Sequence, residues 1–112
     1  MQDIMKLSVL FDYYGGVLTD KQADICDMYY NQNLSLGEIS EIMGITRQGV
    51  RDSLKKSEKI LLFHEEKLGI YKKDMSVAKL IDDVNLLLDE SDISSDYIDK
   101  IKKITKKIKN LI

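Results

Sequence analysis

The chain has 112 residues and a formal net charge of −2, and with 44% hydrophobic residues it can form one compact domain, or one domain with a helical tail. One cysteine and one histidine cannot build an internal disulfide or a zinc cluster of the usual spacing, so we expect no metal and no cofactor. A signal peptide pattern is missing, and no apolar run approaches the roughly 20 residues of a membrane span, which leads us to expect a cytoplasmic protein.

Helical patterns run through the whole sequence. Proline is absent, and apolar residues recur every three or four positions, which predicts an all-α protein. The first apolar stripe predicts a helix over about residues 3–14, ended by the glycine pair that follows it. Thr19 and Gln22 have the spacing of a capping box, which begins a second helix that runs to about Tyr30.

The next two helices are predicted on either side of a sharp turn. Ser35 and Glu38 form a second capping box and begin a short third helix. Gly44 falls where that helix must end, and Thr46 is placed to cap a fourth helix over about residues 47–66. This arrangement fits a helix-turn-helix, in which apolar side chains seat one helix on the other and a small residue lies at their crossing. The residues that meet these requirements are Ile39, Ser40, Met43, Gly44, Ile45, Val50 and Leu54.

One residue departs from the pattern of a regular helix. Gly49 lies inside the fourth helix, where glycine costs about 1 kcal/mol relative to alanine. We expect a close approach of the third helix to explain its presence.

The fourth helix turns a row of polar side chains away from the core. Arginine and glutamine near its start can pair with guanine and adenine, and the lysines further along can reach phosphates. The candidate nucleic-acid-binding residues are Thr46, Arg47, Gln48, Arg51, Asp52, Lys55 and Lys59. A solvated helix face is the alternative, and ten acids against seven bases in residues 1–65 favour it over base reading in duplex DNA.

The end of the chain carries two more amphipathic stripes, which predict helices over about residues 77–88 and 98–111. Charge is polarised there, with seven acids and no base in residues 82–99 and six lysines and no acid in residues 100–112. The basic end is a second candidate site, for RNA, protein or a membrane surface. Its residues are Lys102, Lys103, Lys106, Lys107 and Lys109. The alternative is that these lysines only complement the helix end and the acidic stretch before it.

Two domains and a dimer are expected. Residues 1–66 form the helix-turn-helix domain, and residues 67–112 form a C-terminal helical extension that serves dimerisation or partner binding. Each of the last three helices exposes an apolar stripe, and the first three helices are too small to cover all of them. The sequence therefore predicts a homodimer joined through the long helices.

Catalytic residues are not expected. His64 lies beside two glutamates near the end of the fourth helix, but no serine, cysteine or paired acid accompanies it at helical spacing. We expect His64 to cap the helix end, where positive charge is favoured. Cys26 is expected to pack in the core, as cysteine usually does. The protein is therefore predicted not to be an enzyme.

Several separate blocks of sequence carry a family resemblance. They read L-F-D-Y-Y at 10–14, L-T-D-K-Q at 18–22, L-S-L-G-E-I at 34–39, T-R-Q-G-V at 46–50 and E-K-L-G at 66–69. Together they resemble the YlxM (UPF0122) family of bacterial helix-turn-helix proteins, which is itself similar to the promoter-reading fourth region of sigma factors. The resemblance spans about residues 4–70, and the tail beyond it resembles nothing further.

The resemblance implies an accessory role in the signal recognition particle pathway, through the GTPase subunit of the particle, its RNA, or both. A protein of a different class remains the alternative, namely a sequence-specific transcription regulator that uses the same helix-turn-helix on DNA. A transcription regulator should bind duplex DNA with a sequence preference, and its affinity should fall as salt rises. These two properties distinguish it from an accessory factor of the signal recognition particle.

Overall fold

The computed structural model describes residues 3–112, in which six α-helices occur and no strand. The all-α prediction is therefore confirmed. The chain divides into two compact units, Met1–Tyr71 and Lys72–Ile112. Within residues 3–112 no helix has both the length and the apolar composition required to cross a membrane.

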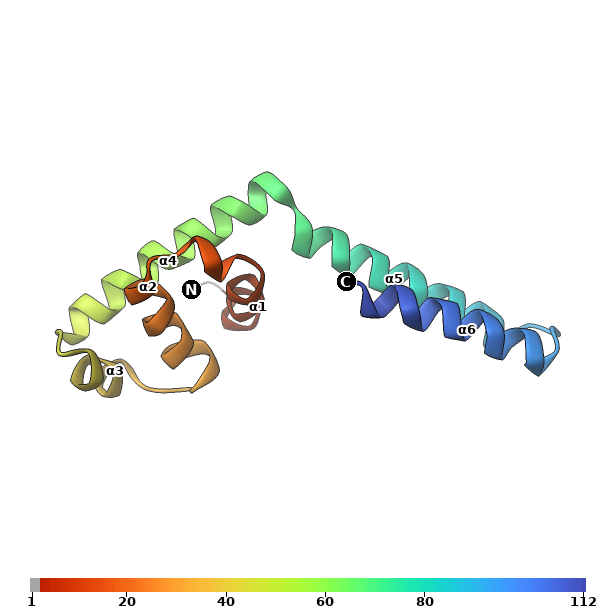
Figure 1. The fold of residues 1–112 in the computed structure, drawn as a ribbon, viewed down its shortest axis with the longest axis horizontal. Coiled ribbons are helices and arrows are strands. Elements are labelled where there is room, and N and C mark those ends of the chain that lie inside the picture. The colour runs from red at the N-terminus through yellow and green to blue at the C-terminus, as the bar shows by residue number, and fades with distance from the viewer. Residues whose placement is uncertain (1–2) are drawn as a thin grey trace. The chain divides into compact units, whose positions relative to one another are not determined.

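The first unit is built around one long helix. Figure 1 shows α1, α2 and α3 gathered along one side of α4. In chain order its elements are α1 (Ile4–Tyr14), the 3-10 turn η1 (Gly15–Val17), α2 (Asp20–Cys26), the π-helical turn η2 (Asp27–Asn31), α3 (Leu36–Met43) and α4 (Arg47–Leu68).

The core of this unit follows from the spacing of small and apolar residues on α4. Val50, Leu54, Ser57 and Leu61 recur every three or four residues, so they share one face, and all four are buried. Side chains of the other three helices pack on this face: Leu10, Tyr14, Ile25, Cys26 and Ile39. Burying each large apolar side chain stabilises the fold by roughly 1.5–3 kcal/mol.

The second half of α4 has its partner within the same chain. Leu61 is fully buried, because α1 packs against this part of α4. The prediction that helix four leaves an apolar stripe for a second protomer was wrong at this position, since α1 of the same chain covers it. Exposed apolar side chains on α4 are confined to its far end, at Phe63 and Leu68.

Both predicted capping boxes are present. Gln22 N donates to Thr19 Oγ1 over 3.2 Å, and Thr19 N donates to Gln22 Oε1 over 3.0 Å. Ser35 and Glu38 make the same reciprocal pair. The Ser35 backbone N–H holds the pKa of Glu38 below its ordinary value, because it bonds to the ionised carboxylate.

The second helix differs from its prediction. An uninterrupted α-helix was expected to reach Tyr30, but α2 ends at Cys26 and the chain continues as the wider π-helical turn η2. The Asp27 carboxylate accepts hydrogen bonds from Asn31 Nδ2 at 2.7 Å and Gln32 Nε2 at 2.9 Å, and these bonds hold its pKa below the ordinary value. We attribute the wider turn to these side-chain bonds, which the spacing of apolar residues does not predict.

A small polar network ties α1 to the end of α4. Tyr14 Oη donates to Glu65 Oε1 over 2.7 Å, and Glu65 Oε1 also accepts from Tyr71 N over 3.0 Å. Ile70 N donates to Tyr14 Oη over 3.3 Å. Burial, with the bond to Glu65, raises the pKa of Tyr14. The network satisfies backbone N–H groups at the start of α5 (Ile70–Asp89), just after Gly69 ends α4 in the left-handed conformation.

Replacing Tyr14 by phenylalanine should lower the free energy of unfolding by about 1–3 kcal/mol, because a partly buried hydrogen bond to a carboxylate is lost. Urea denaturation followed by circular dichroism measures the change. The same replacement at Tyr97, which is 62% exposed, should change the free energy by less than about 0.5 kcal/mol. Equal effects at both positions would contradict the role given to the network.

The second unit is a helical hairpin of α5 and α6 (Ser95–Asn110), which run antiparallel in Figure 1. Polar pairs lie along the hairpin: Asp82 with Lys109 at 2.8 Å, Asn85 with Thr105 at 3.0 Å, and Asp89 with Lys102 at 2.6 Å. The two helices begin earlier than their apolar stripes indicated, because residues 70–76 and 95–97, which precede the stripes, are also helical.

Candidate nucleic-acid interface

The corner between α3 and α4 is built by backbone hydrogen bonds and one cap. Gly44 adopts φ 67° and ψ 32°, and its N–H donates to Ser40 O, which closes α3. Ile45 N also donates to Ser40 O, over 3.2 Å. Thr46 Oγ1 then accepts from Gly49 N over 3.0 Å and begins α4. The two helices of the predicted helix-turn-helix are thus present and are joined at a tight corner.

Replacing Gly44 by alanine should lower the free energy of unfolding by about 1–2 kcal/mol, because a residue with Cβ is strained in the left-handed conformation. A methyl group there would meet no atom within 4 Å, so the cost comes from the backbone alone. Gly16 is the matched control, since it is equally open and lacks a positive φ. Thermal unfolding of both variants tests this, and a destabilised Gly16→Ala with an unchanged Gly44→Ala would contradict it.

The outer face of α4 carries the side chains singled out from the sequence, and all of them are exposed. Thr46 acts as the N-cap, so its hydroxyl already has a backbone partner. Arg47 lies over Gly37 of α3: a methyl group on Gly37 would come within 3.0 Å of Arg47 Nη2. Gly37 therefore leaves room for the guanidinium group, a role that the sequence pattern did not reveal.

Gln48 and Asp52 are bonded to each other. Gln48 Nε2 donates to Asp52 Oδ1 over 2.9 Å, one turn apart on α4. An amide that reads adenine must present both its donor and its acceptor to the base. Base reading by Gln48 would therefore require the bond to Asp52 to break.

Arg51, Lys55 and Lys59 form a row of cations along α4, which we call the α4 basic row. They are spaced by four residues, so their side chains leave the helix on one side. All three are exposed, and within residues 3–112 none of them has an ion pair or a side-chain hydrogen bond. Lys56 is also exposed beside this row and was not singled out from the sequence. The row is thus available to bind an anion.

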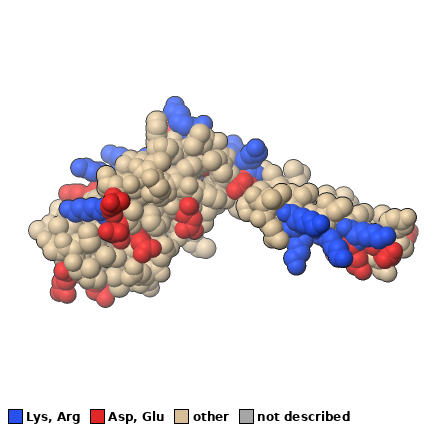
Figure 2. All heavy atoms as spheres, viewed as in Figure 1, with Lys and Arg blue, Asp and Glu red and all other residues tan. Residues whose placement is uncertain are grey.

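The charges of the first unit are unevenly distributed. Five of the seven bases in residues 1–65 fall between Arg47 and Lys59, where only two acids occur. Figure 2 shows lysine and arginine side chains along α4 and acidic side chains around α3. A net acidic body therefore carries a local basic surface, which attracts phosphates over short distances at physiological salt.

Gly49 has a different explanation from the one expected. A methyl group there would lie 3.3 Å from Thr46 Oγ1 and 3.6 Å from Ile45 Cδ1. Both neighbours belong to the corner that precedes α4, so the predicted close approach of helix three is not what confines Gly49. Glycine leaves space for the capping hydroxyl.

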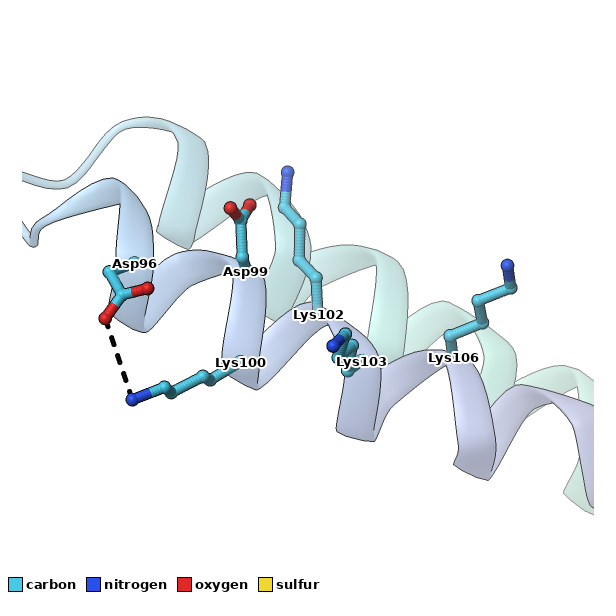
Figure 3. Close-up of a pocket in the computed structure, with 6 residues that line it drawn as sticks. All are labelled: Asp96, Asp99, Lys100, Lys102, Lys103 and Lys106. Carbon is cyan, nitrogen blue, oxygen red and sulfur yellow. Dashed lines mark ion pairs between the residues drawn. The ribbon is translucent and has the colours of Figure 1, made fainter.

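The lysines at the end of the chain fall into two groups. Lys102 and Lys109 pair with aspartates of α5. The remaining candidates of the basic tail are exposed: Lys103, Lys106 and Lys107. A shallow groove along α6 is lined by Asp96, Asp99, Lys100, Lys102, Lys103 and Lys106, in which Lys100 pairs with Asp96 at 3.6 Å (Figure 3). Two aspartates lie at one end of this groove and four lysines follow, so its charge is mixed and positive on balance.

The cysteine and the histidine lie where they contribute to packing. Cys26 is fully buried, as expected, and burial raises the pKa of its thiol. The Nδ1 atom of His64 lies 2.9 Å from Ile60 O within α4, so it contacts a carbonyl one turn earlier rather than the helix end that we expected. In the part of the chain that the structure describes, no three potential metal ligands come together.

Comparison with known proteins identifies the family. The family model described as "Putative helix-turn-helix protein, YlxM / p13 like" matches residues 1–104, so the family likeness extends into the tail beyond residue 70, where none was expected. A UPF0122 protein of Caldanaerobacter subterraneus subsp. tengcongensis is 51% identical over 82 residues, covering 73% of this chain and 70% of that protein. One of Thermoanaerobacter sp. is 39% identical, covering 97% and 96%, and one of Desulforamulus reducens is 43% identical, covering 96% and 94%. The chain therefore belongs to the UPF0122 family of YlxM-like helix-turn-helix proteins.

Proposed function

We propose that the protein is a non-enzymatic, cytoplasmic accessory factor of the signal recognition particle pathway, and that the α4 basic row binds the RNA of the particle. The observation that carries the proposal is the row itself: Arg51, Lys55 and Lys59 project from a rigid helix-turn-helix without partners among residues 3–112. Two protein partners are also proposed. One is the GTPase subunit of the particle, and the other is a second copy of this chain, which binds through the C-terminal hairpin.

The dimensions of the row suit a nucleic-acid backbone. Eight residues separate its first and last members, which corresponds to about 12 Å along a helix with a rise of 1.5 Å per residue. Phosphates of one strand follow each other at about 3.4 Å along a duplex axis, so the row can span several of them. Lysine binds phosphate as a point charge, without demanding a particular base.

Contacts to phosphates are better supported than contacts to base edges. Arg47 lies against Gly37, and Gln48 is bonded to Asp52, so two of the three residues placed to read bases already have neighbours. The excess of acids in residues 1–65 also opposes tight binding along a long duplex. The choice of the signal recognition particle as the source of the RNA rests on the family resemblance.

Sequence-specific binding of duplex DNA is the second candidate function. It is favoured by the position of Arg47, Gln48 and Arg51 in the first two turns of α4, where a recognition helix contacts bases. The similarity to the promoter-reading region of sigma factors supports the same candidate.

Fluorescence anisotropy with the full chain separates these functions. The probes are the RNA of the signal recognition particle, a scrambled RNA of equal length and a random-sequence DNA duplex of equal length, with the purified GTPase tested in a parallel pull-down. We expect the native RNA to bind most tightly, with affinity that falls as salt rises. If the RNA does not bind in the anisotropy assay and the GTPase is not retained in the pull-down, the pathway assignment is rejected. If a DNA duplex selected from a random-sequence pool outcompetes both RNAs, the protein is a transcription regulator instead.

A further inference from the structure

The two edges of the α5–α6 hairpin differ in chemistry. One edge carries ion pairs, Asp82 with Lys109 and Asp89 with Lys102. These pairs also set the register, because residues that bond across the hairpin lie at the same height along it. Charged side chains therefore close this edge.

The opposite edge is apolar and open. Residues two positions apart on a helix point to nearly opposite sides, so Leu80, Val84 and Leu87 face away from the ion-paired aspartates. They are 64%, 41% and 67% exposed. Tyr97, Ile104 and Ile108 of α6 lie on the same edge and are likewise exposed. An exposed apolar strip along both helices of a small hairpin is typical of a surface that binds a partner.

Charged residues border this strip, with acids prevailing on α5 and lysines on α6. Asp83 and Glu90 follow the α5 side. Lys107 and Lys100 follow the α6 side, where Lys100 also pairs with Asp96 of its own helix. Each pair is separated by seven residues, so the acids and the lysines repeat with the same period. The register of the hairpin places Asp83 level with Lys107 and Glu90 level with Lys100.

We propose that a second copy of the chain covers the strip and that the two hairpins form an antiparallel four-helix bundle. This rests on the second copy named among the proposed partners. A two-fold axis parallel to the helices packs α5 of one copy on α6 of the other and keeps all heights unchanged. Asp83 then faces the partner's Lys107, and Glu90 faces the partner's Lys100. An axis across the helices would instead pack α5 on α5 and bring like charges together.

Sedimentation equilibrium of the full chain at micromolar concentration tests the bundle. We expect twice the chain mass of 12.9 kDa for the native protein and for Leu86→Asp, a control that lies one turn after Asp82, toward the ion-paired edge of α5. Leu87→Asp and Ile104→Asp should each give a monomer with unchanged circular dichroism, because both side chains are exposed in the single chain. A monomeric native protein, or a Leu86→Asp variant as dissociated as Leu87→Asp, would overturn the proposal.

Charge reversal tests the direction of the axis. Asp83→Lys with Glu90→Lys should weaken the dimer about tenfold or more, and so should Lys100→Glu with Lys107→Glu, because like charges then face each other. Mixing the two variants should produce a heterodimer at least as stable as the native dimer. A mixture that stays as dissociated as its components would overturn this packing. RNA binding by the Leu87→Asp monomer is measured in a separate assay. The dimer and the RNA contact are therefore tested independently, and one can be rejected without the other.

Discussion

Replacing Ile39 by alanine should lower the free energy of unfolding of the first unit by about 2–5 kcal/mol. Ile39 is the fully buried side chain of α3 and belongs to the core cluster with Val50 of α4. Its removal leaves a cavity between the two helices of the helix-turn-helix, which close packing cannot refill. A domain of this size has a total stability of about 5–15 kcal/mol, so the loss is a large share of it.

Ile42 provides a control on the same helix with the same residue type. It is 60% exposed, so Ile42→Ala should change the free energy of unfolding by less than about 0.5 kcal/mol. Both substitutions alter helix propensity equally, and the difference between them therefore reports burial. Urea denaturation followed by circular dichroism measures both variants. Comparable losses at the two positions would mean that α3 does not pack on α4 as described.

Replacing Arg51, Lys55 and Lys59 together by alanine should weaken RNA binding about a hundredfold at 0.1 M salt. It should also reduce the slope of log affinity against log salt by about 2 to 3, because three fewer phosphate contacts form and fewer counterions are therefore released on binding. The three side chains are exposed and have no partner within the described residues, so the melting temperature should stay the same.

A triple variant of the C-terminal hairpin serves as the control for charge alone. Lys79, Lys103 and Lys106 are exposed and take no part in the proposed dimer contact, and their replacement by alanine removes the same number of positive charges. Only a small loss of RNA affinity is expected from this variant. Equal losses from both triple variants would show that net charge, and not the α4 basic row, determines binding.

The elements that could be predicted from the sequence are those encoded by local chemistry. The capping boxes at Thr19 and Ser35, the left-handed Gly44 and the cap at Thr46 each require interactions among residues only a few positions apart. The buried stripe of α4 follows from its 3.6-residue period. For these reasons the start of α2, the bounds of α3 and the start of α4 agree with expectation.

Features that depend on distant residues were missed. The contact of Arg47 with Gly37 joins two helices, and the bond of Tyr14 to Glu65 joins residues far apart in the sequence. No periodicity encodes such pairs. The pairing of Gln48 with Asp52 is local, and its i to i+4 spacing is enough to predict it, although the sequence alone does not show whether the two side chains bond to each other or to a nucleic acid.

Amide chemical-shift mapping of the isotope-labelled full chain during titration with the signal recognition particle RNA locates the RNA contact residue by residue. We expect the largest shifts between Thr46 and Lys59, centred on the α4 basic row, and we expect them to disappear in the triple alanine variant of that row. Shifts confined to α6, or none at saturating RNA, would contradict the proposed contact.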